Sequence, residues 1–249
     1  MDPWFARIFN ADYLRSYGHM DDVAEAQADA VAACLDLPEA AAVLDLAGGY
    51  GRIAIPLARR GYRLTVLDLS QVFLQAGRER AEALGVGIRW HHGDMREVLQ
   101  EDAFDAVVNL FTSFGYFESD GDNEDVLRAA YESLRPGGRL LVEVVNRERI
   151  VQTEPSLLWR EFEDAVVLDS SRLDLISGRL HTTRIFHDLR TCERRDYSYD
   201  LRLFTPPEYS HMLTRIGFVG IEFFGGLDRC PLTRTAHRLV VTARKPSRA

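Results

Sequence analysis

The sequence has few of the residues that stabilise secreted, metal-bound or membrane-spanning proteins. Its 249 residues include three cysteines, Cys34, Cys192 and Cys230, which lie far apart and form no C-x-x-C pair. This spacing argues against a disulfide framework and against a zinc site. The first residues, MDPWFARIFN, lack a charged segment followed by an apolar one, and no run reaches the roughly 18 apolar residues of a membrane-spanning helix. We therefore expect a cytoplasmic protein without a metal site or a membrane partner.

An excess of basic residues is also absent. The formal net charge is −8 at pH 7, and 46% of the residues are hydrophobic. Because affinity for nucleic acid depends largely on Lys and Arg, this composition argues against a nucleic-acid partner. The length suits one large domain with a modest insertion, and the hydrophobic fraction is sufficient for a sizeable core. Composition leaves both a monomer and a homodimer open.

Apolar segments alternate with helical patterns over the first part of the chain. The expected strands are residues 43–47, 63–70, 88–94, 104–111 and 138–146. The expected helices between them are residues 52–60, 71–84 and a segment capped by Asp122 and ending near Leu134. This alternation is typical of a parallel sheet with helices on both faces, which binds ligands at the carboxyl ends of its strands.

The pattern changes after about residue 155, where alternating runs with turn signals predict an antiparallel meander. A helix from Pro206 to Ile216 and a strand pair at 218–225 and 237–245 should then return to the first sheet. We expect an α/β fold with a doubly wound, mostly parallel seven-stranded Rossmann-like sheet and a small antiparallel insertion. The expected parts are an N-terminal helical cover (1–37), the α/β domain (38–154 and 205–249) and the insertion (155–204).

The stretch VLDLAGGYGR, residues 43–52, ends the first strand in a glycine-rich turn. Such turns bring the backbone close to a ligand at a helix N-terminus, and GYGRIA (49–54) matches the dinucleotide pattern G-x-G-x-x-A. Asp45, at the end of the strand, would repel a pyrophosphate and suits a ligand with a cationic group. An NAD-dependent oxidoreductase is nevertheless kept as an alternative.

Asp45, Gly49 and Gly51 resemble the D-x-G-x-G-x-G motif of the class I S-adenosylmethionine-dependent methyltransferases, with Ala47 in place of the first glycine. Their cofactor carries an ammonium and a sulfonium and no phosphate, in keeping with the acid. The resemblance implies that Asp45, Ala47, Gly48 and Gly49 contact S-adenosylmethionine. Ala47 implies a modest loss of room beside the methionine part of the cofactor.

The same resemblance implies further cofactor contacts at the ends of the next three strands, from Asp68, Leu69, Asp94, Met95, Asn109 and Leu110. Asp68 would accept hydrogen bonds from the ribose hydroxyls, although an acid at a strand end can equally cap the next helix. Asp94 would bind the adenine amino group, and Met95 would pack on the ring. His91 and His92 are adjacent on a strand and face opposite ways, which makes them poor joint metal ligands.

The segment TSFGYF, residues 112–117, is similar to that of bacterial small-molecule methyltransferases. Tyr116 is the expected polar group facing the substrate, and Tyr13, one helical turn before Tyr17, is the expected N-terminal contact to the cofactor. Core packing is the alternative for each tyrosine. An acceptor hydroxyl would need a base, for which Tyr116, His19 and His187 are candidates, and rings such as Phe114 could stabilise the sulfonium.

The expected function is methyl transfer from S-adenosylmethionine to an N, O or C nucleophile of a small molecule. Besides the oxidoreductase, two alternatives stay open: a protein that binds the cofactor without catalysis, and a methyltransferase acting on protein or RNA.

Overall fold

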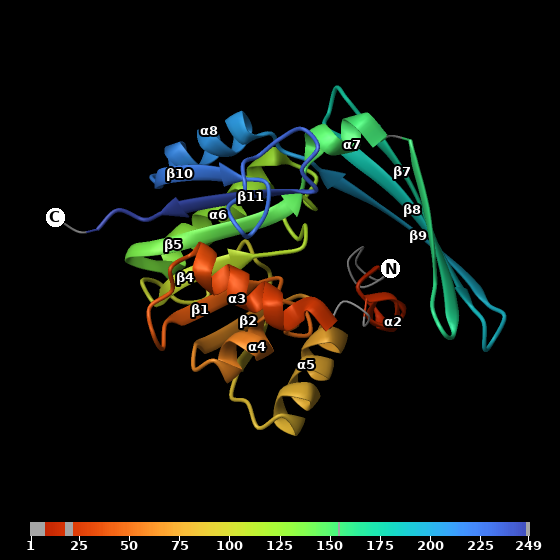
Figure 1. The fold of residues 1–249 in the computed structure, drawn as a ribbon, viewed down its shortest axis with the longest axis horizontal. Helices are drawn as coiled ribbons and strands as arrows, with labels where there is room; N and C mark the ends of the chain where they lie inside the picture. The colour runs from red at the N-terminus through yellow and green to blue at the C-terminus, as the bar shows by residue number, and fades with distance from the viewer. Residues whose placement is uncertain (1–7, 18–21, 154, 248–249) are drawn as a thin grey trace.

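The computed structural model describes residues 8–17, 22–153 and 155–247 (Figure 1). Its larger sheet has seven strands in the order β10-β11-β5-β4-β1-β2-β3. The strands are β1 (Ala42–Leu46), β2 (Arg63–Asp68), β3 (Arg89–His92), β4 (Phe104–Asn109), β5 (Leu134–Val145), β10 (Val219–Phe224) and β11 (Arg238–Arg244). Only β11 runs antiparallel to its neighbours, β5 and β10, and the other pairs are parallel. The expected doubly wound, mostly parallel sheet is confirmed.

Helices cover both faces of this sheet and create two apolar cores. The helices are α3 (Ala24–Cys34), α4 (Ala54–Arg59), α5 (Gln71–Ala83), α6 (Asp120–Ser133) and α8 (Pro206–Ile216). Successive residues of β1 point to opposite faces, so that Val43 packs with α3 and α4 while Leu44 packs with α6 and α8. Because both faces are buried, the central strands are continuous apolar runs rather than alternating ones.

Local sequence signals explain the bounds of α8. Pro206 and Pro207 occupy its first turn, where a missing N–H costs nothing, and the Glu208 carboxylate accepts a 2.6 Å hydrogen bond from the Thr205 N–H. Gly217 ends the helix at φ 114°, a conformation that favours glycine.

Among the predicted boundaries, the start of α6 and the start of β5 are wrong. Ser119, not Asp122, caps α6, because the Ser119 hydroxyl accepts the Asp122 N–H at 2.9 Å and the Asp122 carboxylate pairs with Arg96. Strand β5 begins at Leu134, four residues before the predicted start, because Leu134 already pairs with Phe104 of β4. The predicted N-terminal helices correspond to α2 (Ala11–Tyr17) and α3, while residues 4–7 and 18–21 lie outside the described part.

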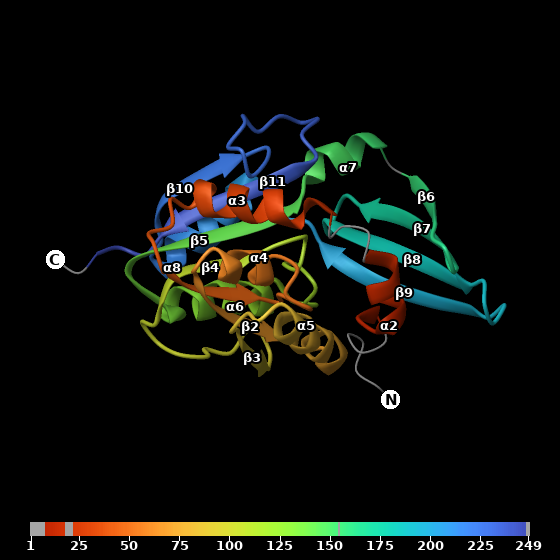
Figure 2. The ribbon, with the colours of Figure 1, turned by 60° about the horizontal axis from the view of Figure 1, so that its bottom comes forward.

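The second sheet is antiparallel and has the order β6-β7-β8-β9 (Figure 2). Its strands are β6 (Ser156–Glu161), β7 (Ala165–Asp174), β8 (Arg179–Asp188) and β9 (Arg194–Arg202), and α7 (Arg147–Thr153) connects them to β5. They lie within the predicted insertion, whose boundaries as a separate unit stay a prediction. None of the described helices is long and apolar enough to cross a membrane.

Helix α2 lies between the two sheets in both views and is attached to the second one by charged side chains. Asp12 accepts hydrogen bonds from Arg195 at 2.6 Å and from the Tyr197 hydroxyl at 2.7 Å. Arg15 pairs with Asp188 at 2.6 Å. This network places α2 over the space between the sheets.

Candidate active site

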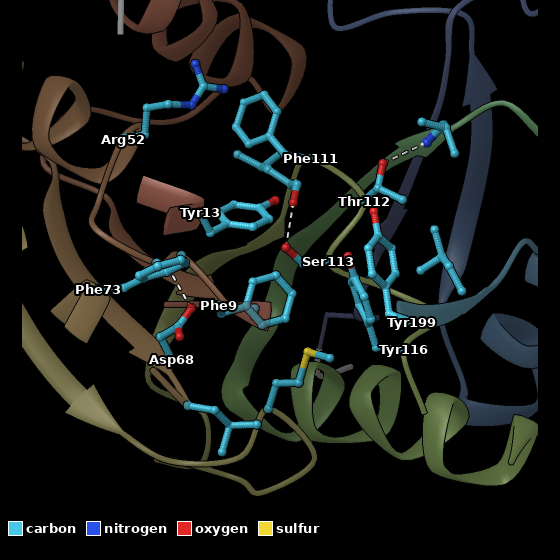
Figure 3. Close-up of a pocket in the computed structure, with 18 of the residues that line it drawn as sticks. Phe9, Tyr13, Arg52, Asp68, Phe73, Phe111, Thr112, Ser113, Tyr116 and Tyr199 are labelled. Atoms are coloured by element: carbon cyan, nitrogen blue, oxygen red, sulfur yellow. Dashed lines mark hydrogen bonds between the residues drawn. The ribbon is translucent and has the colours of Figure 1, made fainter. Parts of the chain in front are cut away.

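A cavity of about 450 Å³ lies where the carboxyl ends of β1, β2 and β4 face the second sheet (Figure 3). Its lining comes from the turn after β1, the segment after β4, the inward face of β6 to β9, and α2 with the residues just before it. The position agrees with the rule that open α/β sheets bind ligands beyond the carboxyl ends of their strands.

The turn after β1 folds back onto the Asp45 carboxylate. Asp45 is 3% exposed, and a Cβ added to Gly48 would lie 2.6 Å from the Asp45 carboxyl carbon. Gly49 has φ 58°, and its N–H donates to an Asp68 oxygen at 2.8 Å. A side chain at Gly48 would displace the Asp45 carboxylate, and one at Gly49 would meet the Phe73 ring at 3.3 Å in a left-handed conformation that favours glycine, which explains both glycines.

Ala47 lies in the same turn with φ 56°, in the left-handed region. The sequence indicated only a loss of room at this position. The structure adds a backbone reason for glycine, because a left-handed alanine costs roughly 1 kcal/mol. Ala47 is therefore a point of local strain in the turn.

Burial shifts the acidity of both carboxylates in this wall. The pKa of Asp45 is raised to about 7, chiefly by burial and then by the nearby charge of Asp68, while Arg52 acts in the opposite direction. Burial also raises the pKa of Asp68 to about 6, against hydrogen bonds from the Ser70 and Gly49 N–H groups. A cation in the cavity would favour the ionised form of both groups.

The segment after β4 contains two consecutive left-handed residues, Phe111 at φ 55° and Thr112 at φ 66°. Strain of this kind persists only where neighbouring groups enforce it, and here Glu143 does so. Its side chain accepts the Phe111 N–H at 3.1 Å, and its carbonyl accepts the Thr112 N–H at 2.9 Å. Thr112 and the following Ser113 consequently face the cavity, and β4 ends at Asn109, two residues earlier than predicted.

Aromatic rings from distant parts of the chain meet across the cavity. The Phe9 ring contacts Phe73 at 6.1 Å and Tyr116 at 5.4 Å between centroids, and Tyr116 contacts Tyr199 of β9 at 6.0 Å. In Figure 3, Tyr13, Phe73 and Asp68 lie on one side, and Thr112, Tyr116 and Tyr199 lie on the other. Sequence reasoning missed Phe9, Phe73 and Tyr199, because no motif marks them.

The second sheet adds a polar wall. The lining residues Arg160, Asp169 and Arg184 form ion pairs, and the Ser171 and Thr182 hydroxyls lie 3.0 Å apart. None of them was predicted. Alternation alone could indicate which residues share a face, and only the tertiary structure shows which face meets the cavity.

Most of the predicted site residues line the cavity, namely Tyr13, Asp45, Ala47, Gly48, Gly49, Asp68, Leu69, Met95, Leu110 and Tyr116. Asp94 and Asn109 do not belong to this lining. The Asp94 carboxylate is paired with Arg96 at 2.7 Å, and the Asn109 amide, 1% exposed, donates to the Leu46 carbonyl at 3.0 Å. Cofactor contacts from these two residues stay predictions.

Other candidates lie elsewhere. Phe114 is a core residue packed on Phe204 and Tyr209, which separates it from any sulfonium in the cavity. His187 is outside the cavity lining, and His19 and the Tyr17 side chain are outside the described residues. No group of three or more His, Cys, Asp or Glu side chains in the described part is arranged to hold a metal ion.

Comparisons with known proteins agree with this geometry. The methyltransferase domain family matches residues 43–138. One relative is YqeM of Bacillus subtilis, which carries a provisional methyltransferase name. The two sequences are 29% identical over 73% of this chain and 75% of that protein.

Solved structures show the same fold over almost the whole chain. The CcbJ methyltransferase of Streptomyces caelestis is 25% identical, with a TM-score of 0.79 and 90% of each chain covered. CalS10 of Micromonospora echinaspora, an amino pentose methyltransferase solved with S-adenosylmethionine, is 24% identical, with a TM-score of 0.72 and coverage of 98% and 99%. The strand order, the methyltransferase domain matched over residues 43–138 and these relatives agree in indicating a class I S-adenosylmethionine-dependent methyltransferase.

Proposed function

We propose that this enzyme methylates an amine of a small molecule held between the turn after β1 and the second sheet. The observation that carries this proposal is the composition of the cavity wall. Its described lining includes three carboxylates, Asp45, Asp68 and Asp169, and no His, Glu, Lys or Cys. Few groups in the lining are therefore able to act as a base. The proposed partners of Asp45 and Asp68 belong to the cofactor, and Asp169 forms ion pairs with two arginines.

At the cofactor end, the residues fit S-adenosylmethionine. The buried carboxylate of Asp45 suits the ammonium of the amino acid part, and Asp68 keeps acceptor capacity beyond its two backbone donors for the ribose hydroxyls. Leu69 and Met95 offer apolar surface for the adenine, and Tyr13 closes the site from α2. When bound, the cofactor supplies a methyl group activated by its sulfonium.

At the acceptor end, an amine needs less assistance than a hydroxyl. A hydroxyl must lose a proton to become a good nucleophile, whereas the neutral form of an amine attacks directly and releases its proton afterwards. Both Asp169 oxygens are already engaged in ion pairs with Arg160 and Arg184. The amine acceptor therefore requires mainly alignment and exclusion of water.

Tyr116 is the residue we assign to alignment of the acceptor. It lies in the lining between Phe9 and Tyr199, so its ring is fixed on two sides. Its phenol oxygen can accept a hydrogen bond from an amine N–H and so direct the nitrogen lone pair toward the methyl group. The description of CalS10 as an amino pentose methyltransferase is in keeping with an amine acceptor.

The decisive experiment is a screen of metabolites with methyl-labelled S-adenosylmethionine. We expect the label in a small amine, with a rate that rises with pH until the acceptor amine is neutral. Label in protein or RNA would contradict the proposal, and cofactor binding without transfer to any acceptor would indicate a non-catalytic protein. Binding of NAD in place of S-adenosylmethionine would favour the alternative function of an NAD-dependent oxidoreductase.

Tyr116→Phe tests the alignment role. We expect kcat to fall by about tenfold, the loss of one hydrogen bond, with the affinity for S-adenosylhomocysteine unchanged. The matched control is Tyr62→Phe, an exchange outside the cavity lining. An unchanged kcat for Tyr116→Phe would show that the ring only packs.

A further inference from the structure

The inward face of the second sheet is ordered in rows that differ in polarity. In the register of β7, β8 and β9, three rows of side chains follow one another across the strands. Starting from the end of the sheet that packs near β5, they are an apolar row, a hydroxyl row and an ionic row. These rows are Leu180 and Leu201, then Ser171, Thr182 and Tyr199, then Asp169 and Arg184. All of these residues line the cavity, so its far wall changes from apolar to charged.

Two guanidinium groups share one carboxylate in the ionic row. Arg184 binds Asp169 in a bidentate manner, with Nε–Oδ1 at 2.7 Å and Nη2–Oδ2 at 2.9 Å, and Arg160 of β6 adds a contact of 2.7 Å to Oδ2. Arg184 is 4% exposed and Asp169 is 8% exposed, whereas the Arg160 side chain is 37% exposed. This cluster therefore carries a formal charge of +1.

The second sheet contributes more positive than negative charge to the lining, whereas the turn after β1 contributes Arg52 together with the carboxylates Asp45 and Asp68. Asp169 is the only carboxylate that the second sheet contributes to the described lining. By contrast, the lining residue Arg238 lies 3.5 Å from a carboxylate of its own, Glu143. Arg184 has little contact with solvent and shares its carboxylate partner with Arg160, and an anionic group of a ligand would offset the remaining positive charge.

We infer that the methyl acceptor carries, in addition to its nucleophile, a carboxylate or phosphate group that Arg160 and Arg184 bind. The planar fork of a guanidinium matches both anions, and hydrogen bonds between charged partners are stronger than neutral ones. Asp169 acts as a positioning residue that fixes the two guanidinium planes. The inference rests on the proposed function, since it concerns the acceptor end of the same cavity.

The position of Arg184 also fits this role. Its guanidinium lies 5.4 Å from the centroid of the Tyr13 ring, so α2 covers it from one side. The hydroxyl row lies next to it along β8, toward the segment that contains Tyr116. An acceptor anchored at the ionic row would therefore extend past the hydroxyls toward Tyr116.

The test measures anion binding to the full-length protein saturated with S-adenosylhomocysteine, by calorimetric titration of phosphate and of acetate at fixed ionic strength. The variant is Arg160→Gln, which removes the less buried guanidinium and keeps the Asp169–Arg184 pair. The matched control is Arg172→Gln on β7, an exposed residue whose neighbours in the strand, Ser171 and Leu173, point to the opposite face. Arg160→Lys retains the positive charge and removes the planar guanidinium group with its paired N–H donors.

We expect at least one of the two anions to bind the wild type, and Arg160→Gln to weaken that binding by about tenfold or more. Arg172→Gln should bind within about twofold of the wild type, and Arg160→Lys should fall between the wild type and Arg160→Gln. Tighter binding of phosphate or of acetate identifies which anion the site prefers.

Equal anion affinity of the wild type and Arg160→Gln would overturn the inference, as would no binding of either anion or an equal loss in Arg172→Gln. Affinity for S-adenosylhomocysteine is measured first in every variant. Normal affinity for it together with absent anion binding would refute the anion site alone. Failure of methyl transfer to every amine would refute the proposed function without affecting the anion result.

Discussion

The two walls of the cavity present different charged groups to a ligand. The wall at the turn after β1, called the anionic wall below, contributes the carboxylates Asp45 and Asp68, whose pKa values are raised chiefly by burial, together with the single guanidinium of Arg52. The wall formed by the second sheet contributes two guanidinium groups for one carboxylate, Asp169. One wall is therefore suited to a cation and the other to an anion. This difference allows the proposed cofactor end and the proposed acceptor end of the cavity to be tested separately.

The two walls also differ in how they are built. The anionic wall consists of strand ends and one tight turn, so its geometry depends on backbone conformation, as at Gly49 with φ 58°. The cationic wall consists of side chains on a regular sheet, such as the cross-strand pair Asp169 and Arg184. Substitutions in the first wall should affect cofactor binding, and those in the second should affect acceptor binding.

The largest effect is expected from Asp68→Asn in the anionic wall. Its two oxygens each hold a backbone N–H, from Gly49 at 2.8 Å and Ser70 at 2.7 Å, and they are the proposed ribose acceptors. Affinity for S-adenosylhomocysteine, measured by calorimetry, should fall by about a hundredfold, the loss of two charge-assisted hydrogen bonds. Asp125→Asn, exposed on α6, is the control. A loss of affinity below about threefold would show that Asp68 does not bind the cofactor, and the assignment of this wall to the cofactor would then be wrong.

A smaller effect should come from pH. The carboxyl of Asp45 has its pKa raised from 3.8 to about 7, so the cofactor-free folded state holds its proton more tightly than the unfolded chain does. Stability of the cofactor-free protein should therefore fall as pH rises from about 4 to about 7. Affinity for S-adenosylmethionine should rise by about tenfold or less over the upper part of this range, because its ammonium favours the ionised carboxylate.

Titration calorimetry at several pH values, in buffers of equal ionic strength, measures this effect. Asp45→Asn should bind more weakly and lose most of the pH dependence. An equal pH dependence of affinity in Asp45→Asn and the wild type would show that a group other than Asp45 is responsible.

The smallest effect is expected from Ala47→Gly. Removal of the Cβ relieves the left-handed conformation at φ 56°, while the added freedom of the unfolded chain opposes this gain. The free energy of unfolding should increase by up to about 1 kcal/mol, as measured by denaturant titration. Ala30→Gly in α3 is the matched control and should lower it by about 1 kcal/mol. A clear loss of stability in Ala47→Gly would mean that the turn is not strained there.

Sequence reasoning succeeded where a local signal determines local structure. The apolar run of β1, the glycines after it and the acid at the end of β2 led to the fold and to one wall of the cavity. It was less accurate at Asp122, because Ser119 offered a competing cap, and at Leu134, because pairing with Phe104 extends β5. It named Phe114 as a ring that could stabilise the sulfonium, although the ring belongs to the core.

The sequence by itself determined the fold class through strand periodicity, and the resemblance of its glycine turn and strand-end acids to a known motif indicated the cofactor, because all of these features are local in the chain. Only the tertiary structure decided which side chains form the wall that the proposed acceptor would contact. Arg160 and Arg184 stand on separate strands, and Tyr13, Tyr116 and Tyr199 are far apart in the chain. Their meeting in one cavity depends on strand register and on the packing of the second sheet against the first, which no local pattern encodes.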